Sequence, residues 1–426
     1  MAAGSMAEVS TIKRAIGSGG KVALGVMATR LAAFGISLAV ARLADPGVFG
    51  AFTLFISLYV LASELPTALD TTFIRFANDP AYADAPGVFV KLLLISKIVY
   101  GVAIACVGLA LGDVLAEEVF NKPDAVDTVR YALVSGSLVA IFYALLALYQ
   151  RNRRFGIQSL IRPLPNLLVL AVVIFGEGVR ITGLRSLLYT YVTVSALAAS
   201  ASGWRLIASM RNGGSKLPGI WRRYVSHAAV LGGASALNLF LSQLDTFFVA
   251  AYLGMEDLGL YGAALRIYAL LGIVITVLTT ILVPEAPDAL RRPEAMRHYR
   301  STAGIFLAAS LVMSAMLAVS MGGVLEFAFG AEYRGAEAVA NLLLLKVLAG
   351  IAGVPFQVLL QCGAKPSLFL FIVLARLLAS WIMLTFLVPA YGAVGAAGSA
   401  ALVAWLVTGA MAWLVLRRAG EIPVKG

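Results

Sequence analysis

The chain has 426 residues, of which 61% are hydrophobic and only 13% charged, and its mean hydropathy is +0.91. A water-soluble domain has too little polar surface to cover that much apolar surface, so the composition excludes one. The net charge is +11, but the basic residues lie in short loops without interleaved aromatic residues, which argues against a nucleic-acid partner.

Apolar segments of about 20 residues, the length that crosses a bilayer, follow one another along the whole chain. The sequence therefore predicts an all-α polytopic membrane protein with about 12 transmembrane helices. The first segment is too long for the apolar region of a signal peptide, so we expect it to be an uncleaved helix. We expect helices at 22–42, 48–69, 88–111, 128–149, 161–176, 185–208, 225–252, 257–283, 301–322, 336–361, 367–388 and 393–416.

Basic residues are unevenly distributed between alternate loops. Most of the 33 Lys and Arg residues fall in one set of loops, for example 151–154 and 291–300. The other set holds few, among them Arg42, Lys122 and Arg334. Cytoplasmic loops carry the excess of positive charge, so the basic set and both termini are predicted to be cytoplasmic. An even number of crossings is consistent with this orientation.

An internal repeat divides the chain near its middle. Residues 40–52 (VARLADPGVFGAF) and 249–261 (VAAYLGMEDLGLY) each end one apolar segment and open the next with a glycine close to an aromatic residue. The matching topology predicts parallel six-helix repeats related by an axis along the membrane normal. We expect an N-terminal lobe at 1–211, a cytoplasmic linker at 212–220 (rich in Gly, Ser and Pro) and a C-terminal lobe at 221–426.

Three stretches resemble a known family: 41–50 (ARLADPGVFG), 72–76 (TFIRF), and Asp245 followed by 258–266 (LGLYGAALR). The chain resembles the polysaccharide-export and O-antigen flippases of the multidrug/oligosaccharidyl-lipid/polysaccharide exporter superfamily. The resemblance implies a MATE-like V-shaped fold of two pseudo-symmetric lobes, with the first, second, seventh and eighth helices at the cavity walls. It implies that Arg30, Asp245 and Arg266 lie in that cavity.

Basic residues also occur inside the predicted membrane helices, roughly 14 Å deep at the ~1.5 Å helical rise per residue. They are Arg30, Lys97, Arg266, Lys346 and Arg376. A charge at such depth costs at least ~2.5–3.5 kcal/mol, so each is expected to face the bundle interior or an aqueous cavity.

Acidic residues at similar depth are scarce. Asp245 is one, while Glu64 and Asp70 lie towards the cytoplasmic end of the second helix. A positive interior suits an anionic passenger such as a lipid diphosphate. The basic set and Asp245 are therefore the predicted substrate contacts, and Arg75 is a predicted contact at the cytoplasmic rim. Alternatively, Asp245 and Arg266 neutralise each other, and Arg30 is a structural ion-pair partner.

Motifs of enzymes and nucleotide-binding proteins are missing from the sequence. It has no phosphate-binding loop with Gly-Lys-Ser/Thr, no His-Glu-x-x-His and no Gly-x-Ser-x-Gly. Cys106 and Cys362 belong to no metal-ligand or disulfide spacing. We expect no catalytic residue, cofactor or metal.

The prediction is a flippase of the bacterial inner membrane for a polyprenyl-diphosphate-linked oligosaccharide, an O-antigen (lipopolysaccharide) or exopolysaccharide repeat unit. Its expected partners are that substrate, membrane lipids and other polysaccharide-assembly proteins. The alternatives are a multidrug or organic-cation antiporter of the same superfamily, a membrane enzyme of polysaccharide assembly, and a non-transporting scaffold.

Overall fold

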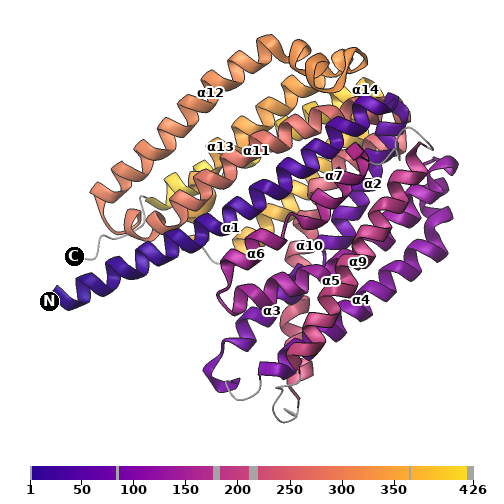
Figure 1. Ribbon diagram of the computed structural model, residues 1–426. Coiled ribbons are helices and arrows are strands. Elements are labelled where there is room, and N and C mark those ends of the chain that lie inside the picture. The colour runs from indigo at the N-terminus through magenta and orange to yellow at the C-terminus, as the bar shows by residue number, and fades with distance from the viewer. Residues whose placement is uncertain (1, 83–85, 176–182, 211–218, 364–365, 420–426) are drawn as a thin grey trace. The chain divides into compact units, whose positions relative to one another are not determined.

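The computed structural model describes residues 2–82, 86–175, 183–210, 219–363 and 366–419, and in these ranges every regular element is helical (Figure 1). The all-α prediction is thus confirmed. Of the predicted linker 212–220, residues 212–218 lie outside the described residues.

Most helices of the first half overlap the predicted apolar segments. The helices are α1 (Ala2–Leu43), α2 (Pro46–Glu64), α3 (Thr67–Ala77), α4 (Pro86–Val114), α5 (Val126–Arg151), α6 (Phe155–Ile161), α7 (Leu164–Phe175) and α9 (Leu184–Met210). Two short 3₁₀-helices, η1 (Pro80–Tyr82) and η3 (Pro123–Ala125), and a π-helical segment, η2 (Leu115–Val119), lie between them. Most of α3 lies beyond the predicted segment 48–69, and α6 lies almost entirely before the predicted segment 161–176.

The helices of the second half are longer. They are α10 (Ile220–Tyr252), α11 (Met255–Ala289), α12 (Pro293–Phe329), α13 (Glu337–Gly363) and α14 (Pro366–Ala419), with the turn η4 (Ala331–Ala336) before α13. Ten helical segments among the described residues are long and apolar enough to cross a membrane. The count of twelve crossings stays a prediction.

Local sequence explains where several helices begin and end. The Asp45 carboxylate accepts a hydrogen bond from the Val48 N–H at 2.9 Å, which caps the start of α2. Pro66 lies between α2 and α3, where a proline interrupts helical hydrogen bonding. Gly330, at φ 123°, ends α12, and Gly392, at φ 59°, interrupts α14. Residues other than glycine rarely adopt such backbone angles.

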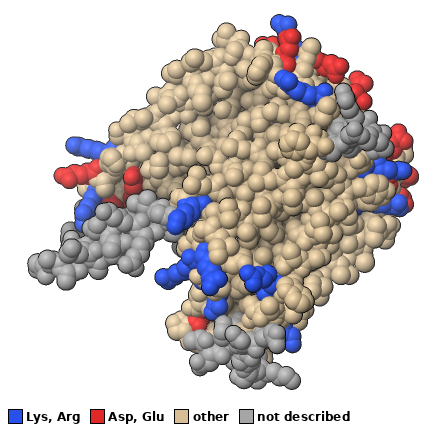
Figure 2. Space-filling view, in the orientation of Figure 1, with Lys and Arg blue, Asp and Glu red and all other residues tan. Residues whose placement is uncertain are grey.

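The surface is that of a protein whose solvent is lipid. Large apolar side chains are exposed along the long helices, such as Val319 (90% exposed) and Phe327 (82%) on α12. On the face drawn in Figure 2, a wide area carries no Lys, Arg, Asp or Glu side chain among the residues shown in colour or tan. Exposed apolar area of this extent is stable in a bilayer and not in water. The protein is therefore a multi-pass membrane protein.

The chain folds into two compact units, each made of two stretches of sequence. Unit 1 comprises Met1–Leu43 and Phe55–Leu239, and unit 2 comprises Ala44–Leu54 and Phe240–Gly426. Relative to the predicted lobes, each unit contains a short stretch from the other half of the sequence.

The core of unit 1 lies where α5 packs against α3, α4 and α9. Phe73, Phe89 and Leu93 are fully buried there. Tyr224, at the start of α10, is also fully buried, and its hydroxyl donates a hydrogen bond to the Leu69 carbonyl at 3.0 Å. This hydrogen bond satisfies a buried hydroxyl and attaches the first part of α10 to α3.

The core of unit 2 lies where α11, α12 and α13 pack together, and α13 also packs against α14 (Figure 1). Leu278 and Leu282 of α11 contact Val347 and Ile351 of α13 in a buried cluster. This packing holds α13, which carries Lys346, in a fixed position within unit 2.

The two repeat stretches meet within unit 2 through equivalent glycines. A methyl group on Gly50 would overlap the Met255 carbonyl, and one on Gly259 would overlap the Pro46 carbonyl. Pro46 and Met255 occupy equivalent positions in the two stretches, as do the two glycines, so the contact is reciprocal. Only residues without a side chain permit helices to approach this closely. The structure thus gives the repeat a physical role.

We expect Gly259→Ala to destabilise the protein by roughly 1–3 kcal/mol, because the added methyl group meets a backbone carbonyl that has no room to move. The measurement is thermal unfolding of the full chain in detergent. Gly304→Ala on α12 is the matched control, since no atom lies within 4 Å of its new methyl group. Equal melting temperatures for the two variants would contradict the close contact.

Candidate functional site

An ion pair is buried where α10 and α13 meet in unit 2. The Lys346 ammonium donates a hydrogen bond to Asp245 Oδ2 at 2.9 Å, and the two side chains are 12% and 7% exposed. The other carboxylate oxygen accepts the Thr246 N–H at 2.9 Å. The ammonium also lies 4.8 Å from the centre of the Tyr268 ring, a favourable cation–π position.

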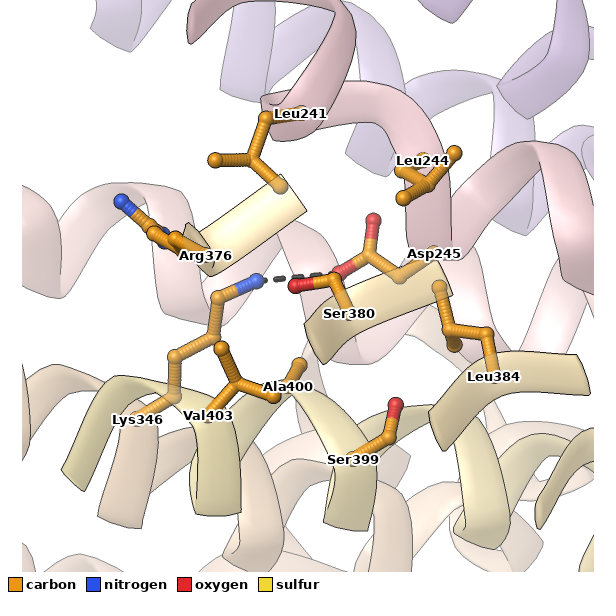
Figure 3. Close-up of a pocket in the computed structure, with 10 residues that line it drawn as sticks. All are labelled: Leu241, Leu244, Asp245, Lys346, Arg376, Ser380, Leu384, Ser399, Ala400 and Val403. Carbon is orange, nitrogen blue, oxygen red and sulfur yellow. Dashed lines mark hydrogen bonds and ion pairs between the residues drawn. The ribbon is translucent and has the colours of Figure 1, made fainter. Parts of the chain in front are cut away.

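A small cavity adjoins this ion pair (Figure 3). Its volume is about 20 Å³, room for roughly one water molecule. Ser380 of α14 is in its wall, together with Arg376, whose side chain points away from the Asp245–Lys346 bond in Figure 3. A diphosphate is much larger than one water molecule, so this arrangement of unit 2 has no room for one beside Lys346.

A second buried ion pair lies in unit 1. Lys97 of α4 is completely buried and donates a hydrogen bond from its ammonium to Asp70 Oδ2 of α3 at 2.8 Å. Asp70 is 14% exposed. The sequence placed Lys97 near the middle of the membrane and Asp70 towards its cytoplasmic end. The helix is interrupted at Pro66, and Asp70 lies in the first turn of the new helix α3. The depth of Asp70 in the membrane therefore cannot be obtained by counting residues along a single continuous helix.

The remaining predicted contacts have different surroundings. Arg30 of α1 is exposed and lies, with Arg162, within electrostatic range of Glu64 in unit 1. Arg266 of α11 is partly buried, and its Nε and Nη2 atoms have no exposed surface. The sequence left open whether Asp245 neutralises Arg266; in the structure Asp245 pairs with Lys346.

Arg75 lies on α3 and not in a loop. Its guanidinium donates a hydrogen bond to Nε2 of His227, on α10 in the same unit. The Thr72 hydroxyl lies 3.1 Å from the other ring nitrogen, Nδ1. Because Nε2 accepts from Arg75, the ring is the tautomer with hydrogen on Nδ1. Arg75 therefore attaches α3 to the first part of α10.

Further polar residues form a cavity of about 540 Å³ in unit 1 that the sequence did not predict. Arg75 is in its wall, with Gln150 at the end of α5 and Gln158 on α6. The sequence signal that could have indicated this cavity was a pair of glutamines on either side of a short arginine-rich loop. Hydropathy does not distinguish these glutamines from other polar residues near a helix end. Among the described residues, no three His, Cys, Asp or Glu side chains are placed to hold a metal ion.

The comparisons with known proteins agree with the resemblance. The profile of the family described as "Polysaccharide biosynthesis protein" matches residues 39–339, most of the chain. The chain belongs to the polysaccharide biosynthesis protein family. A search of curated proteins gives no match.

Solved structures show which fold this family member has. A lipid II flippase MurJ in an inward closed conformation matches with 10% identity and a TM-score of 0.75, covering 93% of this chain and 87% of that one. An inward-facing multidrug resistance MATE family transporter of the MOP superfamily matches with 15% identity and a TM-score of 0.73 (92% and 95% covered). A MOP superfamily transporter from Pyrococcus furiosus matches with 16% identity and 0.66 (94% of both).

The flippase family resemblance and the MATE-like fold are confirmed by these matches. The chain is thus a polysaccharide biosynthesis family member whose fold is similar to that of MOP superfamily transporters.

We expect Asp245→Asn to destabilise the protein by about 3–5 kcal/mol, because the variant leaves the Lys346 ammonium buried without its counter-charge. Adding Lys346→Met should recover part of that loss. The measurement is thermal unfolding of both variants in detergent.

The control for this cycle is Arg185→Gln, which removes an exposed ion pair with Asp127 and should leave the melting temperature unchanged. If Asp245→Asn melts like the wild type, the buried ion pair is not a structural element of unit 2.

Proposed function

We propose that the protein flips a polyprenyl-diphosphate-linked oligosaccharide, an O-antigen or exopolysaccharide repeat unit, from the cytoplasmic to the periplasmic leaflet. The observation that carries this proposal is the excess of basic over acidic side chains inside the helices of a polysaccharide biosynthesis family member. A lipid diphosphate is an anion that such side chains bind through charge-assisted hydrogen bonds.

Pairing divides the basic residues into two groups. Lys97 and Lys346 each neutralise a carboxylate, so they contribute little net charge to a passenger. Arg30, Arg266 and Arg376 are the proposed contacts with the diphosphate, and Lys346 becomes one only when it separates from Asp245. Arginine suits this task because its planar guanidinium matches two phosphate oxygens at once.

Alternating access is the proposed mechanism. The substrate must stabilise the inward-open and outward-open states to different extents, because a ligand with equal affinity for both shifts nothing. The ion pair between α10 and α13 suits a role in this change: Lys346 would exchange Asp245 for the substrate diphosphate when the helices separate. The lipid tail would stay in the bilayer throughout.

Twelve membrane crossings are part of the proposal. α14 has 54 residues, roughly 80 Å at ~1.5 Å per residue, and its helix is interrupted at Gly392. That length allows two crossings of a ~30 Å hydrocarbon core. Counting α14 twice and adding α9, a helix of 27 residues, to the ten segments found gives twelve. An even number places both termini on the same side of the membrane, and the distribution of basic residues makes the cytoplasm that side.

The proposed location is the bacterial inner membrane, where polyprenyl-linked saccharides are assembled and consumed. Proposed partners are the lipid-linked saccharide, the surrounding lipids and other polysaccharide-assembly proteins.

The rival function is export of an organic cation, because multidrug MATE transporters share this fold. A cation exporter needs a carboxylate that is available to its substrate. Asp245 and Asp70 are both bound to lysines, and Glu64 has Arg162 and Arg30 within electrostatic range. These basic neighbours favour the flippase.

We expect Arg30→Ala and Arg266→Ala, each in a strain that lacks the wild-type gene, to reduce saccharide export at least tenfold. Loss of one charge-assisted bond to phosphate, worth about 1.5–3 kcal/mol, predicts this size of effect. The measurement is the amount of lipid-linked saccharide on each leaflet, with membrane-inserted protein matched between strains.

Arg291→Ala is the control, since Arg291 is an exposed basic residue between α11 and α12 and should export normally. Normal export by both cavity variants would overturn the proposal. Loss of cation efflux on Asp245→Asn, with saccharide export intact, would favour the rival.

A further inference from the structure

The polar cavity of unit 1 has the size of a ligand site. Its volume of about 540 Å³ lies within the ~300–1,000 Å³ of small-molecule pockets. Its walls come from the end of α2, from α3, from α5 and from α6. The proposed diphosphate contacts, Arg30, Arg266 and Arg376, take no part in the wall.

Buried hydrogen-bond acceptors in this wall lack donors within the described residues. Gln158 is only 3% exposed, and its amide nitrogen donates to Gln150 Oε1 at 3.4 Å while its own Oε1 has no partner there. Asp70 uses Oδ2 to bind Lys97, and its Oδ1 likewise has no partner. Buried acceptors without donors cost free energy. Neither oxygen has exposed surface, so the Gln158 and Asp70 side chains must turn towards the cavity for a ligand to donate to them.

The charges around the cavity disfavour an ion as that ligand, because its wall holds two basic side chains, Arg75 and Arg162, as well as two acidic ones. Arg162 and Arg30 lie within electrostatic range of Glu64, and Lys97 binds Asp70. Each carboxylate in the wall therefore already has a positively charged neighbour. An added cation would meet these basic groups, and an added anion would meet the two carboxylates. A neutral ligand with several hydroxyl groups avoids both penalties and donates to the free acceptors.

We propose that this cavity binds the sugar portion of the passenger, with Gln158, Glu64 and Asp70 accepting hydrogen bonds from sugar hydroxyls. The inference rests on the proposed function and deepens it by assigning sugar recognition to residues other than the diphosphate contacts. The α3 and α6 helices thereby select the passenger by its saccharide. Basic residues bind any lipid diphosphate equally well.

The test uses the purified full chain in detergent and two probes. One is the lipid-free oligosaccharide released by mild acid from the host's lipid-linked pool, and the other is inorganic pyrophosphate. Saturation-transfer NMR titrations report binding of the oligosaccharide, and ligand-induced changes in melting temperature report binding of each probe.

Gln158→Leu should weaken oligosaccharide binding at least tenfold, while pyrophosphate raises the melting temperature as in the wild type. Glu64→Gln keeps the shape of a side chain that is exposed to the cavity, and it should weaken oligosaccharide binding less than Gln158→Leu does. It is the alternative test variant if Gln158→Leu fails to fold. Gln361→Leu, an exposed glutamine near the end of α13, is the matched control and should bind normally.

Equal oligosaccharide binding by wild type, Gln158→Leu and Glu64→Gln would overturn the inference. So would a wild-type protein that exports saccharide but binds no lipid-free oligosaccharide. In these cases the flippase itself stands. Normal export by Arg30→Ala and Arg266→Ala overturns the flippase and leaves sugar binding by the cavity to be judged on its own titration.

Discussion

A charge buried in a helical bundle within lipid must be compensated inside the bundle, because neither lipid nor water reaches it. Two ion pairs in this protein satisfy that constraint. Lys97 and Asp70 join α4 to α3, and Lys346 and Asp245 join α13 to α10. The first pair joins consecutive helices and the second joins helices about 100 residues apart. In both cases the contact that compensates the charge also holds two helices together.

The same constraint separates structural from functional charge. A lysine that neutralises a carboxylate contributes stability and adds little to the field that a substrate meets. The excess of basic over acidic residues therefore resides in arginines, which bind phosphate more specifically than lysines do. A buried pair is also sensitive to rearrangement: separating Asp245 from Lys346 exposes two charges that need new partners. This makes the pair a suitable element for coupling a passenger to a conformational change.

Helix contact without side chains is the second constraint. At Gly50 and Gly259 the starts of α2 and α11 approach until backbone meets backbone. The two glycines occupy equivalent positions in the repeated stretches, so each stretch contributes the same surface to the contact. Phe49, next to Gly50, packs edge-on against Tyr333 with ring centres 5.6 Å apart, so aromatic packing surrounds a contact that the glycines make possible.

The sequence by itself determined the helical class, the membrane environment and the family, because hydropathy and local motifs are properties of neighbouring residues. It also identified Asp245, Lys346 and Lys97 as buried charges. Only the tertiary structure decided that Asp245 binds Lys346, that Lys97 binds Asp70, and that Gln150 and Gln158 face one cavity. Partners of a buried charge depend on how helices distant in sequence are rotated and packed, and no local pattern encodes that rotation.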